Sequence, residues 1–458
     1  MHDPRTSLLL EIFAELSKRA VHYAVLHGGT NSPPPVRSDV DIAFTANPAK
    51  ILEPIFQDLQ QQGKAVLVGK LHYDVPYGYY YVLAMPSHPR SFLMIDGLYD
   101  PFGINRYRLS TVMLLIDRIR EPWGYRVSPR MGALYLLSKR SAKGEISEDK
   151  LRSLRESVKS CGLPFNKEVS ELLGFRDESV FDQILNTEDS DQAGVVLKEI
   201  GVGIEKEYRR RRFGRFLLGK IWTILRLFRR FIQPTGLFVV LVGPDGVGKS
   251  TVRTEIIEAT ADAFRRRQHF HWRPGILPKL GRPDKTTDRS PAIQDPPKVS
   301  KYSGLVSYAR FFYYWLDFII GYWLVVYPQK AQTGLVIAER YFPDVIVNPA
   351  RYGFALPHWL MRLAARLVPQ PDILILLKAN PAAIHQRKPE LTVEEIGHQI
   401  CLFESELNHW DDAIVLDVHG SAEVVAREAL DLIIEKRASL TARNIGRQLK
   451  PTKPKPIA

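Results

Sequence analysis

Cysteine is scarce in this sequence of 458 residues, which contains only two, Cys161 and Cys401. Two cysteines cannot build a disulfide framework, so a disulfide-stapled fold is excluded and a reducing cytoplasm is the expected location. The N-terminal stretch also lacks the long apolar segment of a secretory signal peptide. Acidic residues number 50 against 63 basic ones, which gives a net charge of +13. A basic chain favours polyanionic partners such as nucleotides, nucleic acid or an anionic membrane surface.

The chain is too long for one ordinary domain, and a composition of 45% hydrophobic and 25% charged residues suits globular cores. Shifts in composition along the sequence predict four parts. We expect a first domain over residues 1–204, a basic amphipathic helix over 205–236, a second domain over 237–436 and a disordered basic tail over 437–458.

The most informative stretch is Leu237–Thr251, LFVVLVGPDGVGKST. An apolar run of strand length leads into a match to G-x-x-x-x-G-K-[ST], and a helical pattern follows, which disfavours a chance glycine loop. Glycines let backbone N–H groups surround a phosphate, lysine meets the outer phosphates, and a serine hydroxyl meets Mg²⁺. The residues assigned to ATP and Mg²⁺ are Gly243, Asp245, Gly246, Val247, Gly248, Lys249, Ser250 and Thr251.

Three further apolar runs, Gly334–Ala338, Pro371–Leu377 and Ala413–Asp417, alternate with helical segments after this glycine-rich phosphate-binding loop, the P-loop. Strands that alternate with helices predict a parallel, doubly wound α/β sheet. Glu339 and Arg340 follow the first of these runs, at the edge where such sheets bind ligands.

On these residues, Leu237–Lys436 resembles the thymidylate kinase-like P-loop kinases. The resemblance implies phosphoryl transfer from ATP, with Mg²⁺, to a nucleoside monophosphate-type acceptor. It implies that Asp245 contacts the sugar of the acceptor, that Glu339 supports Mg²⁺ or the acceptor, and that Arg340 holds the acceptor phosphate. Arg387 would belong to a lid that closes over ATP. The residues expected to act in catalysis are therefore Lys249, Glu339, Arg340 and Arg387.

The sequence departs from the thymidylate kinases at positions that bear on the acceptor. Asp344 and Asn348-Pro349 stand where that family has a serine and a tyrosine–glutamine pair. Asp317 has no arginine beside it, and the lid offers Arg387 and Lys388 without an arginine array. We therefore expect phosphoryl transfer, with an acceptor that the sequence does not identify.

A second chemical pattern lies near the N-terminus, where His27-Gly28-Gly29 precedes a strand that carries Asp39 and Asp41. Aspartates at i and i+2 of a strand point to the same face and could share divalent cations. A later strand, Ser91–Asp100, ends near Asp96, whose carboxylate could complete a two-metal site. The alternative is a strand that ends in solvated acids.

This pattern resembles the nucleotidyltransferase superfamily that includes DNA polymerase β. The resemblance implies an α+β domain in which Asp39 and Asp41 bind Mg²⁺ and Asp96 activates the nucleophile. His27 and the prolines Pro33–Pro35 depart from the family pattern. The combination with a kinase-like half looks similar to bacterial proteins associated with surface-polysaccharide synthesis.

Residues 105–200 are predicted to be mostly helical, with helices at Met113–Ile119, Met131–Leu137, Leu151–Val158 and Val180–Leu185. A small basic cluster, Lys139, Arg140 and Lys143, could meet a phosphate, but the preferred interpretation is a solvated helix end.

Glu205–Pro234 combines apolar residues at helical spacing with many arginines. Two interpretations stay open: an element that binds an anionic membrane surface or a partner, and a helix that packs its apolar stripe between two domains. Tyr308–Tyr327 is nearly long enough to span a bilayer, but Arg310 and Asp317 would be costly there, so we expect a buried helix. Phe270–Ser303 is a long insertion with few regular signals.

Two functional hypotheses follow. The first is an ATP-dependent kinase fused to a nucleotidyltransferase-like domain, located in the cytoplasm and, through the basic helix, at the inner face of a membrane. The second is a membrane-surface ATP-binding scaffold or switch without kinase turnover. No base-stacking module accompanies the positive charge, so no specific nucleic acid is expected; a homodimer is left open.

Overall fold

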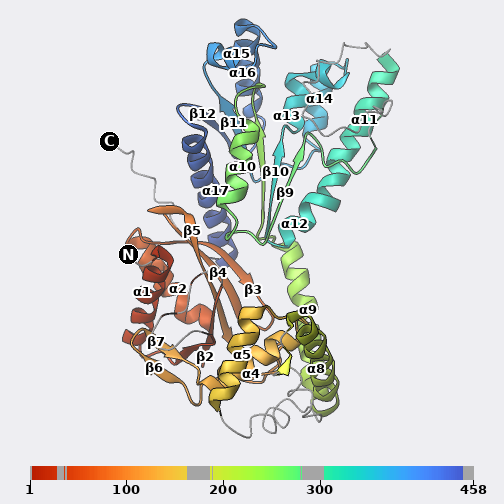
Figure 1. Ribbon diagram of the computed structural model, residues 1–458. Helices are drawn as coiled ribbons and strands as arrows, with labels where there is room; N and C mark the ends of the chain where they lie inside the picture. The colour runs from red at the N-terminus through yellow and green to blue at the C-terminus, as the bar shows by residue number, and fades with distance from the viewer. Residues whose placement is uncertain are drawn as a thin grey trace. The chain divides into compact units, whose positions relative to one another are not determined.

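The computed structural model describes residues 3–27, 33, 36, 39–161, 186–187, 189–278, 280 and 304–446 (Figure 1). The chain divides into two compact units, residues 1–229 and 230–458, and each is described by itself.

The described part of the first unit contains a seven-stranded mixed sheet in the order β3-β4-β5-β2-β1-β7-β6. The strands are β1 (Tyr23–Val25), β2 (Val40–Phe44), β3 (Val66–His72), β4 (Tyr77–Met85), β5 (His88–Tyr99), β6 (Ile119–Glu121) and β7 (Gly124–Arg126). The helices are α1 (Pro4–Lys18), α2 (Pro48–Gln61), α3 (Thr111–Leu114), α4 (Pro129–Ser141), α5 (Glu148–Cys161), α8 (Ser190–Arg211) and α9 (Phe213–Ile232), the last of which crosses the boundary between the units.

The order of strands in this sheet decides which acids meet. β2 pairs in parallel with β5, and their register sets Asp41 directly opposite Asp96. The helix predicted near the N-terminus is α1, which begins at Pro4 under the cap of Asp3 and buries the stripe of Leu8, Leu9, Ile12, Phe13 and Leu16.

The prediction that residues 105–200 are mostly helical is wrong in one part. β6 and β7 form an antiparallel hairpin there, and α3 ends at Leu114, before the predicted helix end at Ile119. Strands of three residues with polar members show too little alternation to be recognised. The predicted helix Val180–Leu185 lies outside the described residues.

The described part of the second unit contains a five-stranded parallel sheet in the order β12-β11-β8-β10-β9. The strands are β8 (Leu237–Val242), β9 (Arg266–His271), β10 (Gly334–Glu339), β11 (Ile373–Lys378) and β12 (Ala413–Asp417). The helices are α10 (Lys249–Ala259), α11 (Gly304–Gly321), α12 (Tyr327–Ala331), α13 (Phe342–Val347), α14 (His358–Ala365), α15 (Pro381–Arg387), α16 (Val393–Leu407) and α17 (Ala422–Ile445).

Helices cover both faces of this sheet, so the predicted mixed α/β fold with a parallel sheet is confirmed. The side chains of Phe238, Val240 and Val242 pack with α11, α13 and α16, while α10 and α17 pack on the opposite face. A strand covered on both faces must be apolar throughout, as β8 is. β8 lies between β10 and β11, so the loops that follow β8 and β10 meet at one edge of the sheet.

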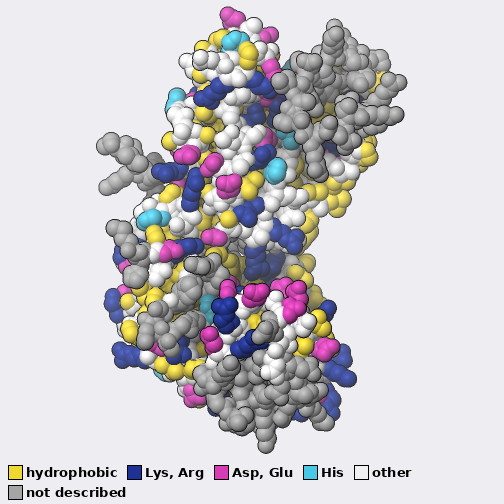
Figure 2. All heavy atoms as spheres, in the orientation of Figure 1, with side chains coloured by type: hydrophobic (Ala, Val, Ile, Leu, Met, Phe, Trp, Pro, Cys, Tyr) yellow, Lys and Arg dark blue, Asp and Glu magenta, His cyan; other side chains and the backbone are white. Residues whose placement is uncertain are grey.

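Three sequence predictions need correction in this unit. β9 was not predicted, because Arg266 and Arg267 make it a basic, exposed edge strand without an apolar run. The helix expected to be buried at Tyr308–Tyr327 is α11, continued by a π-helical segment and α12, and only one of its faces is buried. Hydrophobic side chains reach the surface along α11 in Figure 2.

α17 continues to Ile445, so Arg437–Ile445 is helical and not a disordered tail. The buried Arg437 holds this part of the helix in place, because its guanidinium donates to the carbonyl oxygen of Ala263 (2.5 Å) and lies over the Phe264 ring. Among the helices that the structure describes, none combines the length and the apolar character needed to cross a bilayer.

Candidate nucleotide and metal sites

The P-loop connects β8 to α10 and is shaped by three glycines with positive φ: Gly243 (139°), Gly246 (85°) and Gly248 (106°). A Cβ on Gly243 would lie 2.3 Å from the carbonyl oxygen of Leu377, so no larger residue fits there. This backbone leaves N–H groups and the N-terminus of α10 free to face an anion. Of the other assigned residues, Val247 is buried under the loop and Thr251 is exposed on α10.

Lys249 is buried beneath the loop, with a side chain that bends back toward it. Its ammonium donates to the carbonyl oxygens of Gly243 and Pro244, both at 2.8 Å, and lies 3.6 Å from the carboxylate of Asp245. Burial lowers the pKa of the Lys249 ammonium to about 8. The lysine is therefore preorganised at the loop, where a phosphate would replace the two carbonyl partners.

Glu339 stands at the end of β10, beside the start of α10. Its buried carboxylate accepts a hydrogen bond from the Ser250 hydroxyl (2.8 Å), and its other oxygen contacts the guanidinium of Arg253. A serine hydroxyl and a carboxylate in contact are the oxygen donors that Mg²⁺ prefers. These two residues fit a Mg²⁺ site next to the phosphate loop, and both were predicted from the sequence.

Asp245 is clamped between two arginines. Its carboxylate contacts the guanidinium of Arg340 and that of Arg351, the latter at 2.6 Å. Burial acts to raise the pKa of Asp245, but the positive charges of Lys249, Arg340 and Arg351 outweigh it and hold this pKa well below its usual range. An acceptor phosphate would have two guanidinium groups to bind at this point. Arg351 was missed in the sequence because no recognised motif contains it.

Arg340 adopts an unusual backbone conformation, with φ of +60°. Its backbone N–H donates to the carbonyl oxygen of Leu241 (2.9 Å), which ties the end of β10 to β8, while the side chain turns to Asp245. A positive φ in a residue other than glycine marks strain that the surrounding contacts must hold.

The two predicted lid residues lie at the C-terminal end of α15. Arg387 is exposed and has no hydrogen-bond or ion-pair partner within the described ranges. Lys388 passes close to the P-loop, since a Cβ on Gly246 would lie 2.9 Å from the Cβ of Lys388. Of the two predicted lid residues, Lys388 therefore lies next to the P-loop, whereas the side chain of Arg387 is exposed.

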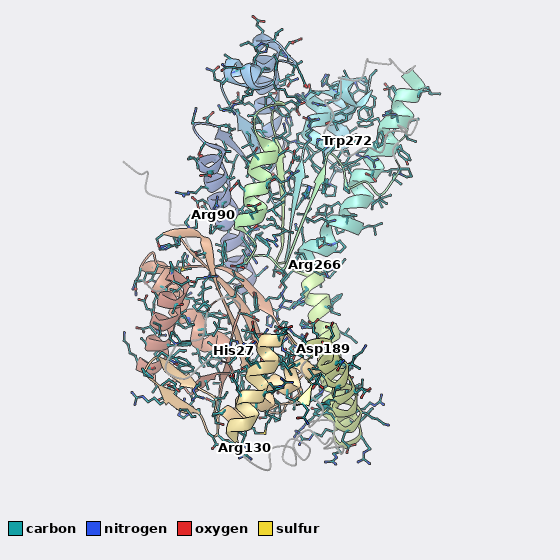
Figure 3. The ribbon with its side chains drawn as sticks, in the orientation of Figure 1. His27, Arg90, Arg130, Asp189, Arg266 and Trp272 are labelled. Carbon is teal, nitrogen blue, oxygen red and sulfur yellow. The ribbon has the colours of Figure 1, made fainter. Side chains whose placement is uncertain are left out.

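Asp317 has an arginine partner that the sequence did not reveal. Arg273, in the segment after β9, donates to its carboxylate at 2.7 Å, and the backbone N–H groups of Gly275 (2.9 Å) and Leu277 (2.7 Å) complete its hydrogen bonds. Trp272, labelled in Figure 3 beyond the end of β9, packs on Tyr314 of α11. This network fixes the described segment after β9 against α11.

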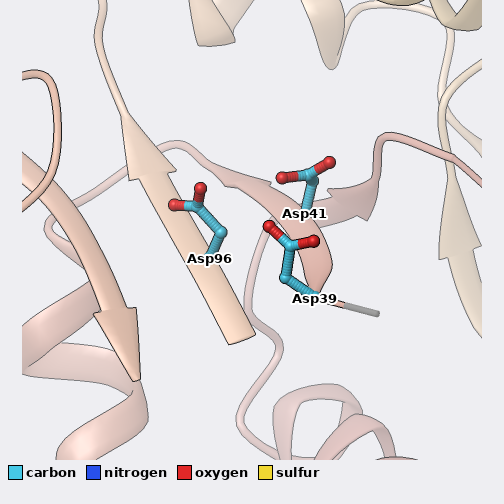
Figure 4. A group of neighbouring side chains, drawn as sticks. All are labelled: Asp39, Asp41 and Asp96. Atoms are coloured by element: carbon cyan, nitrogen blue, oxygen red, sulfur yellow. The ribbon is translucent and has the colours of Figure 1, made fainter. Parts of the chain in front are cut away.

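In the first unit, Asp39, Asp41 and Asp96 come together, with one carboxylate oxygen from each within 4.8 Å of the others. Figure 4 shows the three side chains as neighbours. Two details differ from the prediction: Asp39 precedes β2, which starts at Val40, and Asp96 lies within β5. Gly28 and Gly29 lie outside the described residues.

The partners of Asp41 give this cluster its electrostatic character. Its carboxylate contacts the ammonium of Lys139 and lies 3.1 Å from Nε2 of His27, which is labelled in Figure 3. Burial acts to raise the pKa of Asp41, but these two partners outweigh it and hold this pKa below its usual range. Burial and the neighbouring Asp41 raise the pKa of Asp96 well above its usual range. Three acids with a single lysine between them suit a divalent cation.

The basic cluster at the end of α4 is a solvated helix end, as predicted, only at the exposed Lys143; the prediction is wrong for Lys139 and Arg140. Lys139 binds Asp41, and Arg140 is 8% exposed. Beside the acids lies a cavity of about 370 Å³, which shares Asp74 and Tyr107 with the pocket around Asp41 and Asp96.

Positive charge dominates the lining of this cavity. Its basic residues are Arg106, Arg108, Lys143, Lys198 and Lys220, against the acids Asp74 and Glu205. The buried hydroxyls of Ser138 and Ser141 also line it and have no hydrogen-bond partner in the described structure. Cations and free hydroxyls next to a candidate metal site suit a phosphate-bearing molecule.

Comparisons with known proteins add little to this picture. The sequence matches no protein-family model and no curated protein. Among solved structures, the thymidylate kinase from Ehrlichia chaffeensis is similar over 44% of this chain and 100% of its own, with 16% sequence identity and a TM-score of 0.28. A TM-score this low does not establish a shared fold, so the function of this chain has to be inferred from its own residues.

Proposed function

We propose that residues 230–458 form an ATP-dependent kinase that phosphorylates a small phosphorylated acceptor of the nucleoside monophosphate type. The observation that carries the proposal is the hydrogen bond from Ser250 to Glu339 (2.8 Å) beside the buried Lys249. This contact supports the proposal because a hydroxyl and a carboxylate that could hold Mg²⁺ then lie beside a lysine that could bind the outer phosphates, at one edge of a parallel sheet.

Each residue has a distinct role in this proposal. The loop backbone and Lys249 bind the β- and γ-phosphates, and Ser250 and Glu339 hold Mg²⁺, which neutralises the charge that develops on the phosphates. Arg340, with Arg351, binds the acceptor phosphate and orients it for attack. Arg387 and Lys388, at the end of α15, belong to the lid that closes over ATP. Catalysis then comes from positioning and electrostatic stabilisation, without a covalent intermediate.

The test is a panel of acceptors incubated with purified protein, Mg²⁺ and ATP labelled at the γ-phosphate. We expect the label to pass to a nucleoside monophosphate or a phosphorylated sugar, and not to the matching unphosphorylated nucleoside, which has no phosphate for Arg340 and Arg351. We also expect Mg·ATP at about 100 times its Kd to stabilise the unit by about 2.7 kcal/mol in thermal unfolding. Nucleotide binding without transfer to any acceptor would favour the scaffold alternative.

A second activity is proposed for the first unit, because Asp39, Asp41 and Asp96 each have a carboxylate oxygen within 4.8 Å of the other two. We propose metal-dependent nucleotidyl transfer. Asp39, Asp41 and Asp96 would together hold the metal that neutralises the triphosphate, and Asp96 would also activate the acceptor hydroxyl. The basic cavity beside them would hold phosphate groups of a substrate.

Replacing Asp96 by asparagine should separate activity from stability in this unit. The substitution removes a carboxylate that faces two others, so we expect thermal stability to be unchanged or higher. Pyrophosphate release from a nucleoside triphosphate and Mn²⁺ binding measured by electron paramagnetic resonance should both fall at least about tenfold. The matched control is Asp117→Asn, on the exposed turn after α3, which should change neither. Undiminished metal binding by Asp96→Asn would contradict the proposal.

A further inference from the structure

Helix α9 exposes an unusual amount of apolar surface. The structure describes all of α9, and none of its side chains is buried. Ten large apolar side chains are between 45% and 67% exposed: Phe213, Leu217, Leu218, Ile221, Ile224, Leu225, Leu227, Phe228, Phe231 and Ile232. A contiguous apolar face of this kind marks an interaction site more often than a free surface.

The exposed residues gather on one side of the helix. At 3.6 residues per turn, all except Leu227 fall within roughly 140° of the circumference. We call these nine residues the apolar stripe of α9.

A different side of α9 packs on the first unit. The guanidinium of Arg108 lies 5.8 Å from the ring centroid of Phe216, and the rings of Trp222 and His72 lie 6.5 Å apart. A Cβ on Gly219 would come within 3.2 Å of the carbonyl oxygen of Ile104, so the backbones approach closely. These contacts hold α9 by residues that are not part of the apolar stripe. Within the stripe, Phe231 contacts the Tyr327 ring (5.0 Å between centroids) and stays 53% exposed, so the stripe remains largely at the surface.

The charges of α9 all have the same sign. The helix contains Arg215, Lys220, Arg226, Arg229 and Arg230 and no acidic residue. On the helical circumference, Lys220 borders the apolar stripe on one side and Arg229 borders it on the other. The last turn of α8 adds Arg209–Arg211 immediately before it. Long basic side chains beside an apolar stripe can reach phosphate groups while the stripe is buried.

We propose that α9 lies in the surface of an anionic lipid bilayer, with the apolar stripe among the acyl chains and its flanking arginines and lysine at the lipid phosphates. A helix of 20 residues would lie along the membrane over about 30 Å. A second copy of the chain fits less well, because α9 contains five basic residues and no acidic one, so two α9 helices side by side would bring like charges together. The inference is independent of the reactions proposed above.

The experiment is flotation of the full-length protein with vesicles of phosphatidylcholine alone and of phosphatidylcholine mixed with phosphatidylglycerol. We expect binding to the anionic vesicles, weakened by added salt, and little binding to the neutral ones. In the stripe, Ile224→Ser combined with Phe228→Ser should weaken partitioning roughly a hundredfold. Arg229→Gln should weaken it by about fivefold.

The matched control combines Ile116→Ser and Val195→Ser, which are 69% and 62% exposed outside α9, compared with 67% and 63% for Ile224 and Phe228. This control should bind like the wild type, and all variants should keep the wild-type melting temperature. A wild-type protein that does not bind anionic vesicles, or a stripe variant that binds as well as the wild type, would overturn the proposal. So would a wild-type dimer that the stripe variant converts to a monomer without any vesicle binding, since a second copy would then cover the stripe.

Discussion

Replacing Lys249 by alanine is expected to abolish phosphoryl transfer from ATP, with a loss of turnover of roughly a thousandfold. The ammonium is held at the P-loop by the carbonyl oxygens of Gly243 and Pro244, so its loss removes a preorganised positive charge from the outer phosphates. Asp245 keeps its two arginines in the variant, so the fold should survive. The measurement is initial-rate ATP turnover at saturating acceptor, beside a thermal unfolding curve.

The control for this variant is Lys378→Ala, at a lysine of the same sheet whose ammonium pairs with Glu404 (3.0 Å) and Asp417 (3.6 Å) instead of the loop carbonyls. It should retain wild-type turnover. Turnover by Lys249→Ala within about tenfold of the wild type would mean that the P-loop does not act in the reaction.

Replacing Asp317 by alanine should cost the second unit about 3–5 kcal/mol of unfolding free energy. The carboxylate is completely buried and accepts hydrogen bonds from Arg273 and two backbone N–H groups. Without it the two N–H groups lose their acceptor, and the buried Arg273 loses its counterion and keeps the carbonyl oxygen of Leu277. Asp317→Asn keeps an oxygen acceptor but loses the charge, so its effect should be smaller. The measurement is urea denaturation of the full chain, in which the relevant transition is the one that Mg·ATP shifts to higher urea.

Glu428→Ala tests whether the effect of Asp317→Ala is specific, because Glu428 is an exposed acid on α17. A change within about 0.5 kcal/mol is expected there. If Asp317→Ala were equally mild, the buried pair with Arg273 would not be an important contribution to the stability of this unit.

Local sequence patterns predicted the centre of the second unit well. The apolar run from Leu237, the P-loop and α10 follow one another without interruption, so their arrangement depends on neighbours in the sequence. The meeting of Glu339 with Ser250 could also be anticipated, because adjacent parallel strands present their carboxyl ends at one edge.

Features that depend on contacts between distant segments could not be predicted from local sequence patterns. Arg273 and Asp317 are 44 residues apart, and no local signal couples them. Asp96 was expected beside Asp39 and Asp41 only through the family resemblance, because the register between β2 and β5 that sets it opposite Asp41 cannot be read from the sequence pattern of either strand. β9 was not predicted, because an exposed basic edge strand lacks the hydrophobic periodicity by which strands are recognised.

The position of β8 in its sheet also has a consequence for the order of events during synthesis. β8 is the first strand of its sheet along the chain, yet it lies at the centre, with β10 and β11 as its neighbours. The ribosome therefore releases this wholly apolar strand about a hundred residues before its first central partner exists. A nascent chain that stops before β11 has the complete P-loop sequence but lacks Leu377, whose carbonyl oxygen lies against Gly243. The nucleotide site is thus encoded early and assembled late, and β8 needs protection from aggregation in the interval.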